Sequence, residues 1–130
     1  MRKQYHFWPG EDGLDAWDVD RLIELTAGLP EEEVRLEDIP EIDSVYWFDQ
    51  WELPTVGNVV EHFRLLQEVN LTYPVILGPE NRVMDGMHRI GRAPLEGRTT
   101  IRAVRLPELP MPDYRGCRPD ELPYEAEQGG

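Results

Sequence analysis

The sequence predicts an α+β fold in which helices pack against a small mixed sheet. The helical part of the prediction rests on residues 56–69, whose apolar side chains recur at the i, i+3, i+4 and i+7 spacing of one helical face. The strand part rests on short apolar runs at 74–77 and 83–84 and on the β-rich stretch 99–106. A chain of 130 residues has the length of one domain with a single hydrophobic core.

The N-terminal part is predicted to be an arm followed by a helix. Residues 1–13 are polar and are interrupted by the Trp-Pro-Gly sequence at 8–10. Either Asp12 or Asp15 is placed to cap a helix that runs to about Ala27, where glycine and proline stop it. The apolar positions of this helix fall on one face and are Val19, Leu22, Ile23 and Ala27.

The middle of the chain combines a short strand, a turn and the strongest helix signal. Residues 34–36 alternate as in a strand, and the Pro-containing segment 39–43 is typical of a turn. The aromatic cluster 46–51 has no clear period. Thr55 is placed to cap the helix 56–69, whose apolar stripe consists of Val56, Val59, Val60, Phe63, Leu66 and Val69.

The C-terminal part is predicted to contain a helix, a strand and a tail. The helix spans residues 87–96 and is closed by Gly97. Pro94 inside it removes a backbone hydrogen bond, at a cost of ~3 kcal/mol in a regular helix, so a kink or a stop is expected near Ala93. Residues 107–130 contain five prolines and many acids and are expected to be an extended or disordered appendage, which leaves 14–106 as the domain.

The charge and the cysteine content exclude several classes of function. Acids outnumber Lys and Arg by 26 to 13, and a net charge of −13 repels nucleic acid and anionic membranes. The single cysteine, Cys117, excludes a disulfide framework, and the histidines at 6, 62 and 88 are too scattered for a metal signature. No apolar run approaches the ~20 residues of a membrane span and the start does not read as a signal peptide, so a cytoplasmic protein is expected. The oligomeric state stays open.

Arginines gather in one part of this acidic chain. Six of the 13 Lys and Arg residues lie between positions 82 and 105, where only two acids, Asp85 and Glu96, accompany them. These cations surround the segment 85–89 and are Arg82, Arg89, Arg92, Arg98, Arg102 and Arg105.

The segment 85–89, Asp-Gly-Met-His-Arg, has the chemistry of a phosphate-binding turn between a strand and a helix. A helix start carries unpaired N–H groups and about half a positive charge, and Gly86 there lets an anion approach the backbone. His88 and Arg89 add side-chain donors, and the planar fork of arginine suits phosphate oxygens. Asp85 has three open roles: capping the helix, orienting His88 or helping to hold a metal ion. The alternative is a purely structural turn with solvated side chains.

The segment 85–93, which reads DGMHRIGRA, resembles the central motif of the ParB/sulfiredoxin superfamily. Gly97 and the β-rich stretch 100–104 follow it, and the turn at 39–42, the long helix and the first apolar strand precede it in the same order. The resemblance therefore covers about residues 34–106 and implies a ParB/sulfiredoxin-like sheet with packed helices.

The resemblance also implies a ligand, because the Gly-x-His-Arg turn of this superfamily binds nucleotide phosphates. Members include the CTP-binding domain of chromosome-partitioning ParB proteins, the ATP-using sulfiredoxins and the free-serine kinases, which use ADP or ATP. ATP, ADP or CTP, with Mg²⁺ accompanying the nucleotide, is thus implied as a ligand of Asp85, Gly86, Met87, His88, Arg89 and Arg92.

Two departures from the superfamily narrow the function. Met87 stands where sulfiredoxins have their nucleophilic cysteine, so reduction of sulfinic acids by that route is excluded. Partitioning ParB proteins continue into a DNA-reading helix-turn-helix, whereas a Pro-rich acidic segment follows here. DNA binding and partitioning are therefore disfavoured.

Further candidate residues lie outside the turn. Thr55, Asn58 and His62 share the spacing of polar ATP contacts on the preceding helix of sulfiredoxins, although a capping Thr55 and a solvated helix flank explain them equally. Glu41 and Asp43 are candidate general bases for a kinase-like reaction, in which His88 would also take part; the alternative is that the two acids are ordinary surface residues. The aromatic cluster 46–51 would wall a ligand pocket or belong to the core.

Together these observations predict a domain that binds a nucleotide or another phosphorylated small molecule and that could transfer a phosphoryl group as free-serine kinases do. The alternative from another class is a non-catalytic module for regulation or protein contacts.

Overall fold

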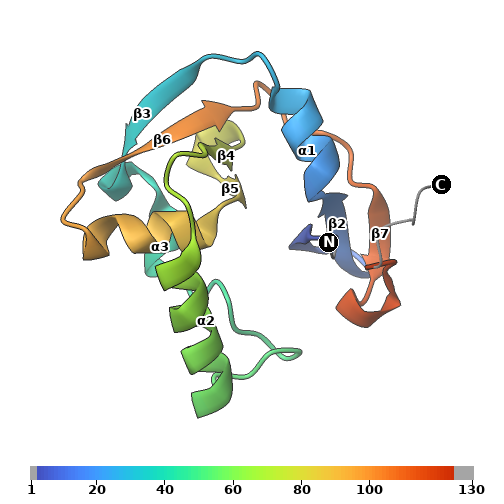
Figure 1. The fold of residues 1–130 in the computed structure, drawn as a ribbon. Helices are drawn as coiled ribbons and strands as arrows, with labels where there is room; N and C mark the ends of the chain where they lie inside the picture. The colour runs from blue at the N-terminus through green and yellow to red at the C-terminus, as the bar shows by residue number, and fades with distance from the viewer. Residues whose placement is uncertain (1–2, 125–130) are drawn as a thin grey trace, which may run out of the picture. The chain divides into compact units, whose positions relative to one another are not determined.

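The computed structural model describes residues 3–124, which fold as two compact units. One unit is built from both ends of the chain, Met1–Ala27 and Leu109–Gly130, and the other is Gly28–Glu108. Both contain helix and strand, so the α+β class is confirmed, with three α-helices and two small sheets (Figure 1). None of the helices in the described part has the length and apolarity needed to cross a lipid bilayer.

The unit formed by the chain ends contains a three-stranded antiparallel sheet and one helix. Strands β1 (Tyr5–Gly10), β2 (Gly13–Asp18) and β7 (Tyr114–Cys117) are ordered β1-β2-β7, and helix α1 covers Val19–Thr26. The indole N–H of Trp17 donates to the carbonyl of Pro110 at 2.8 Å, so the segment before β7 is fastened to β2. The expected arm and tail thus contain strands of one sheet.

The prediction that a helix begins at Asp12 or Asp15 is wrong. Residues up to Asp18 form β2, because Leu14 and Ala16 alternate into the core while the backbone pairs on both sides. The actual N-cap is Asp18, whose carboxylate accepts the N–H of Asp20 at 2.9 Å. Pairing with β1 and β7 therefore makes these residues a strand, although their sequence predicts the start of a helix.

The unit Gly28–Glu108 contains a four-stranded mixed sheet and two helices. The strands β3 (Glu31–Arg35), β4 (Val75–Leu77), β5 (Val83–Asp85) and β6 (Thr100–Arg105) are ordered β3-β6-β4-β5, with β4 and β6 parallel and the other pairs antiparallel. The core includes Ile39, Val75, Leu77, Val83, Ile90 and Ala103, all without exposed surface, and the partly buried Tyr46 and Trp47 pack against it. A small mixed sheet with packed helices is therefore confirmed for this unit.

Helix α2 (Val56–Glu68) forms where the sequence predicts it, but its apolar stripe does not face the core. Val56, Val60 and Phe63 are 82%, 58% and 51% exposed. Of that stripe, only Leu66 and Val69 are half-buried, and they share this state with Asn58, His62 and Leu65. Helix α2 is thus rotated so that its polar flank meets the rest of the unit.

Helix α3 (Met87–Leu95) begins directly after β5 and passes through Pro94. The proline lies in the last turn, where few helical hydrogen bonds remain to be lost. Gly97 has a φ of +76°, the left-handed conformation of a helix-terminating glycine. The predicted helix is confirmed, although it does not stop at Ala93.

Candidate active site at the start of helix α3

Gly86 forms the junction between β5 and α3 and has a left-handed backbone, with φ +105° and ψ 24°. A Cβ atom here would lie 2.7 Å from Cγ1 of Val75, so conformation and packing both require glycine. The first helical bond runs from the N–H of Ile90 to the carbonyl of Gly86. The N–H groups of residues 87–89 precede it, and no oxygen among residues 3–124 accepts them.

The guanidinium of Arg89 donates to protein oxygens. It donates to Asp85 at 2.7 Å and to the carbonyls of Tyr73 and Pro74 at 3.2 and 3.1 Å. Only 15% of the Arg89 side chain and 18% of the Asp85 side chain are exposed. Burial raises the pKa of Asp85, and the charge of Arg89 opposes that rise. This pair therefore anchors the turn to the segment before β4.

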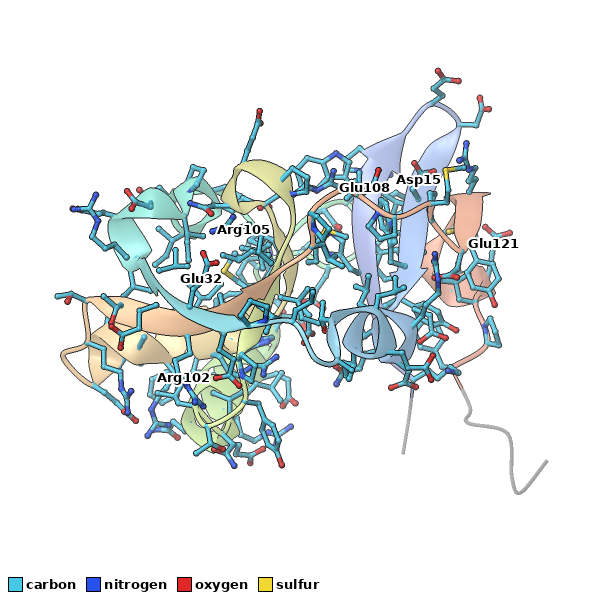
Figure 2. The ribbon with its side chains drawn as sticks, turned by 90° about the horizontal axis from the view of Figure 1, so that it is seen from above. Asp15, Glu32, Arg102, Arg105, Glu108 and Glu121 are labelled. Carbon is cyan, nitrogen blue, oxygen red and sulfur yellow. The ribbon has the colours of Figure 1, made fainter. Side chains whose placement is uncertain are left out.

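The other arginines do not converge on the turn. Arg92 donates to the carbonyls of Leu66 and Gln67 at 3.0 and 2.7 Å and to Glu96 at 2.9 Å. On the sheet, Arg105 of β6 and Glu32 of β3 point toward each other and are joined at 2.8 Å (Figure 2). Arg98 and Arg102 are likewise paired, with Glu96 and Glu31. Among residues 3–124, none of these four arginine side chains has a hydrogen bond or an ion pair with the turn 85–89.

His88, in the first turn of α3, belongs to a chain of three side chains. Its Nε2 lies 2.7 Å from Nδ1 of His62 on α2. The Nε2 of His62 in turn bonds the carboxylate of Glu52, which lies in the loop before α2. We call these residues the Glu52–His62–His88 chain.

Trp47 supports both rings of this chain. The His62 and His88 rings lie 4.9 and 4.6 Å from the indole, at interplanar angles of 16° and 12°. Their planes are within 12° of parallel and their centroids are 5.0 Å apart, and because the two bonded nitrogens are only 2.7 Å apart the rings lie edge to edge. Phe48 meets His62 edge-on at 5.3 Å. The two histidines are therefore held in one plane.

Burial and, to a smaller extent, neighbouring His62 lower the pKa of His88 to about 4, and Glu52 opposes this shift. His88 is thus neutral near pH 7. Its Nδ1 has no partner among residues 3–124 and is not one of their buried unpartnered atoms, so part of its surface reaches solvent. The site combines free helix-start N–H groups with an open imidazole nitrogen.

The remaining predicted residues have other surroundings. Glu41 accepts the backbone N–H of Val83 at 2.6 Å, and burial raises its pKa; Asp43 is exposed. Thr55 caps α2 by accepting the N–H of Asn58 at 3.1 Å, and the amide of Asn58 donates to the carbonyl of Leu53 at 2.8 Å. Of Thr55, Asn58 and His62, it is His62 that bonds to a residue of the turn, through His88.

Sequence reasoning missed Glu52 and the role of Trp47, because the aperiodic loop 46–54 carries no helical or strand pattern. One local signal was present: Asp49 precedes two residues whose N–H groups it accepts, those of Trp51 at 2.8 Å and Glu52 at 2.9 Å. Such a turn folds the loop back on itself and fixes the position of Glu52.

A hollow of about 790 Å³ lies at the other end of α3 and does not include the turn. Its polar lining comprises Glu68, Asn70, Thr72, Glu96, Arg98 and Arg102.

Among residues 3–124 no three His, Cys, Asp or Glu side chains are placed to hold a metal ion. Comparison of the chain with protein-family models, curated proteins and solved structures finds no match.

Proposed function

We propose that the unit Gly28–Glu108 binds the phosphate of a nucleotide or another phosphorylated small molecule at the start of α3. One observation carries the proposal: the N–H groups of residues 87–89 have no acceptor among residues 3–124, and Nδ1 of His88 in the same turn has no partner there either. Helix-start amides and the helix dipole favour an anion at this place.

The resemblance of segment 85–93 to the ParB/sulfiredoxin superfamily supports the same site and is the ground for proposing that fold type. The elements of this unit follow in the expected order, as β3, α2, β4, β5, α3 and β6. Because Arg89 and Arg92 donate to protein oxygens, the backbone N–H groups of residues 87–89 are expected to hold the phosphate, with the imidazole of His88 beside it. Mg²⁺ would arrive with the nucleotide, since Asp85 is paired with Arg89.

Transfer of the phosphoryl group to a small hydroxyl compound is the reaction class that suits this site. It requires a proton acceptor near the phosphate. Glu41 accepts a backbone N–H of β5, whereas His88 lies in the first turn of α3 itself. The imidazole is therefore the acceptor that we propose.

Thermal melts with ATP, ADP, CTP, GTP and inorganic phosphate, with and without Mg²⁺, test the binding. A ligand at about 100 times its Kd adds about 2.7 kcal/mol of stability, a shift of several degrees. His88→Pro, which removes one of the three first-turn N–H groups, should reduce the shift. Arg98→Ala, at the far end of α3, is the matched control and should retain it. Unchanged melts with all five ligands would exclude the proposed function.

A further inference from the structure

We propose that Glu52, His62 and His88 form a proton relay that makes Nδ1 of His88 the acceptor for the proton of a hydroxyl or water molecule beside the bound phosphate. The relay residues lie on three different elements: the loop before α2, α2 and α3. Because this inference rests on the proposed function, its test includes a measurement that needs no ligand.

The carboxylate of Glu52 determines which nitrogen donates in each hydrogen bond of the Glu52–His62–His88 chain. An ionised carboxylate only accepts hydrogen bonds, so Nε2 of His62 must carry a proton. In a neutral His62 the other nitrogen, Nδ1, is then bare and accepts. His88 must therefore donate through its Nε2, 2.7 Å away, which leaves its Nδ1 with a free electron pair. Nδ1 of His88 is therefore the nitrogen that can accept a proton.

The relay also explains how a buried histidine can act as a base. Burial opposes a positive charge on His88. When Nδ1 of His88 takes a proton, its Nε2–H can pass to Nδ1 of His62. The positive charge then rests on His62, beside the carboxylate of Glu52, and His88 is neutral again. Glu52 and His62 are thus positioning residues, and His88 is the group that would contact the substrate.

The proton transfer balances without any further reactant. The O–H bond of the substrate breaks, its electron pair stays on the oxygen, and the proton forms an N–H bond at Nδ1 of His88. At the same time the proton on Nε2 of His88 moves to Nδ1 of His62. The oxygen so activated would attack the phosphorus atom of the bound phosphoanhydride, whose leaving phosphate takes the electron pair of the broken P–O bond.

Rigid geometry favours this transfer. Both rings stack on Trp47, with interplanar angles of 16° and 12°, so neither can rotate without losing its stacking contact. Phe48 bounds His62 at its edge. Proton transfer along a hydrogen bond depends on such alignment.

Long-range proton–nitrogen correlation spectra of the full-length chain near pH 7 test the relay directly. We expect His88 to show a bare Nδ1 and a protonated Nε2. In Glu52→Gln the amide can either accept from or donate to Nε2 of His62, so the direction is no longer fixed and a fraction of His88 with a protonated Nδ1 should appear. Glu61→Gln, on the exposed side of α2, is the control and should leave both ring patterns unchanged. A protonated Nδ1 in the unaltered chain, or no change in Glu52→Gln, would overturn the relay.

A second measurement asks whether the relay is used. For the nucleotide that binds, Glu52→Gln should lower the rate of phosphate release to water or small hydroxyl compounds by about 100- to 10,000-fold, while Kd changes less than about threefold. Equal rates of phosphate release for the unaltered chain and Glu52→Gln, or nucleotide binding without any phosphate release, would overturn the role of the relay in catalysis. Failure of all nucleotides to bind would instead overturn the proposed function. The protonation patterns of the two histidine rings would still show whether the Glu52–His62–His88 chain has the proposed direction.

Discussion

Nδ1 of His62 lies 2.7 Å from Nε2 of His88, which joins helices α2 and α3 through two side chains that are 26 positions apart in the sequence. The contact accounts for the orientation of α2, whose polar flank carries His62 toward α3. It also sets the site apart from a bare helix start, because an oriented imidazole lies within the same first turn.

Arg89 is expected to stabilise the fold as well as to border the site. Arg89→Met would leave the carboxylate of Asp85 buried without its partner, which typically costs about 3–5 kcal/mol. Urea denaturation should show a loss of this size. The double variant Asp85→Asn/Arg89→Met should recover part of it. Arg98→Ala removes an exposed pair with Glu96 and should cost less than about 1 kcal/mol. Equal losses for Arg89→Met and Arg98→Ala would contradict the structural role.

Gly86→Ala should destabilise the chain much more than a glycine change elsewhere. A φ of +105° is strained for alanine by about 1–3 kcal/mol, and the contact with Val75 adds to that cost. The matched control is Gly57→Ala in α2, where a Cβ meets nothing within 4 Å and alanine should stabilise by about 0.5–1 kcal/mol. Denaturation midpoints that move in the same direction for both variants would argue against this assignment of Gly86.

Sequence reasoning succeeded where the structure depends on residues close together in the sequence, and it failed where the structure depends on residues far apart. The helix 56–69 and the turn at Gly86 were predicted well because local period, caps and glycine geometry determine them. The start of the first helix was not, because β2 exists only through pairing with β1 and with β7 near the other end of the chain.

The candidate site shows the same division. Gly86, His88 and Arg89 were proposed from one short segment, and His62 from the resemblance of its spacing to the ATP contacts of sulfiredoxins; their part in ligand binding stays a prediction. Glu52 and Trp47 come from an aperiodic loop, so only the folded structure brings them to His88. The arginine count misled for a related reason: sequence proximity says nothing about which side chains pair with Glu31, Glu32 or Glu96.

The neutral state of His88 predicts a pH dependence of stability. Its pKa is about 4 in the folded chain against an ordinary 6.5, so between these values the unfolded chain binds a proton that the folded chain does not. Stability rises with pH wherever the unfolded state binds more protons. The contribution of His88 should therefore fall as the pH is lowered from about 6.5 to about 4.

The comparison that isolates this effect is between the unaltered chain and His88→Gln, measured by urea denaturation at a series of pH values. The titratable groups that act on His88 are Glu52 and His62, and the Asp85–Arg89 pair lies in the same turn of the chain. Asp85 and Glu41, whose pKa values burial raises, are present in both proteins and largely cancel in the difference. A difference that stays constant across the window would contradict a buried neutral His88.

The rotation of α2 predicts which of its apolar residues matter. Phe63 is exposed, so Phe63→Gln should change the free energy of unfolding by no more than about 0.5 kcal/mol. Leu66 is half-buried, and a Cβ on Gly91 of α3 would be only 2.7 Å from its methyl group. Leu66→Ala should therefore cost roughly 1–2 kcal/mol, less than at a fully buried position. If Phe63→Gln were the more damaging change in urea denaturation, α2 would have to pack through its apolar stripe, and His62 would be turned away from His88.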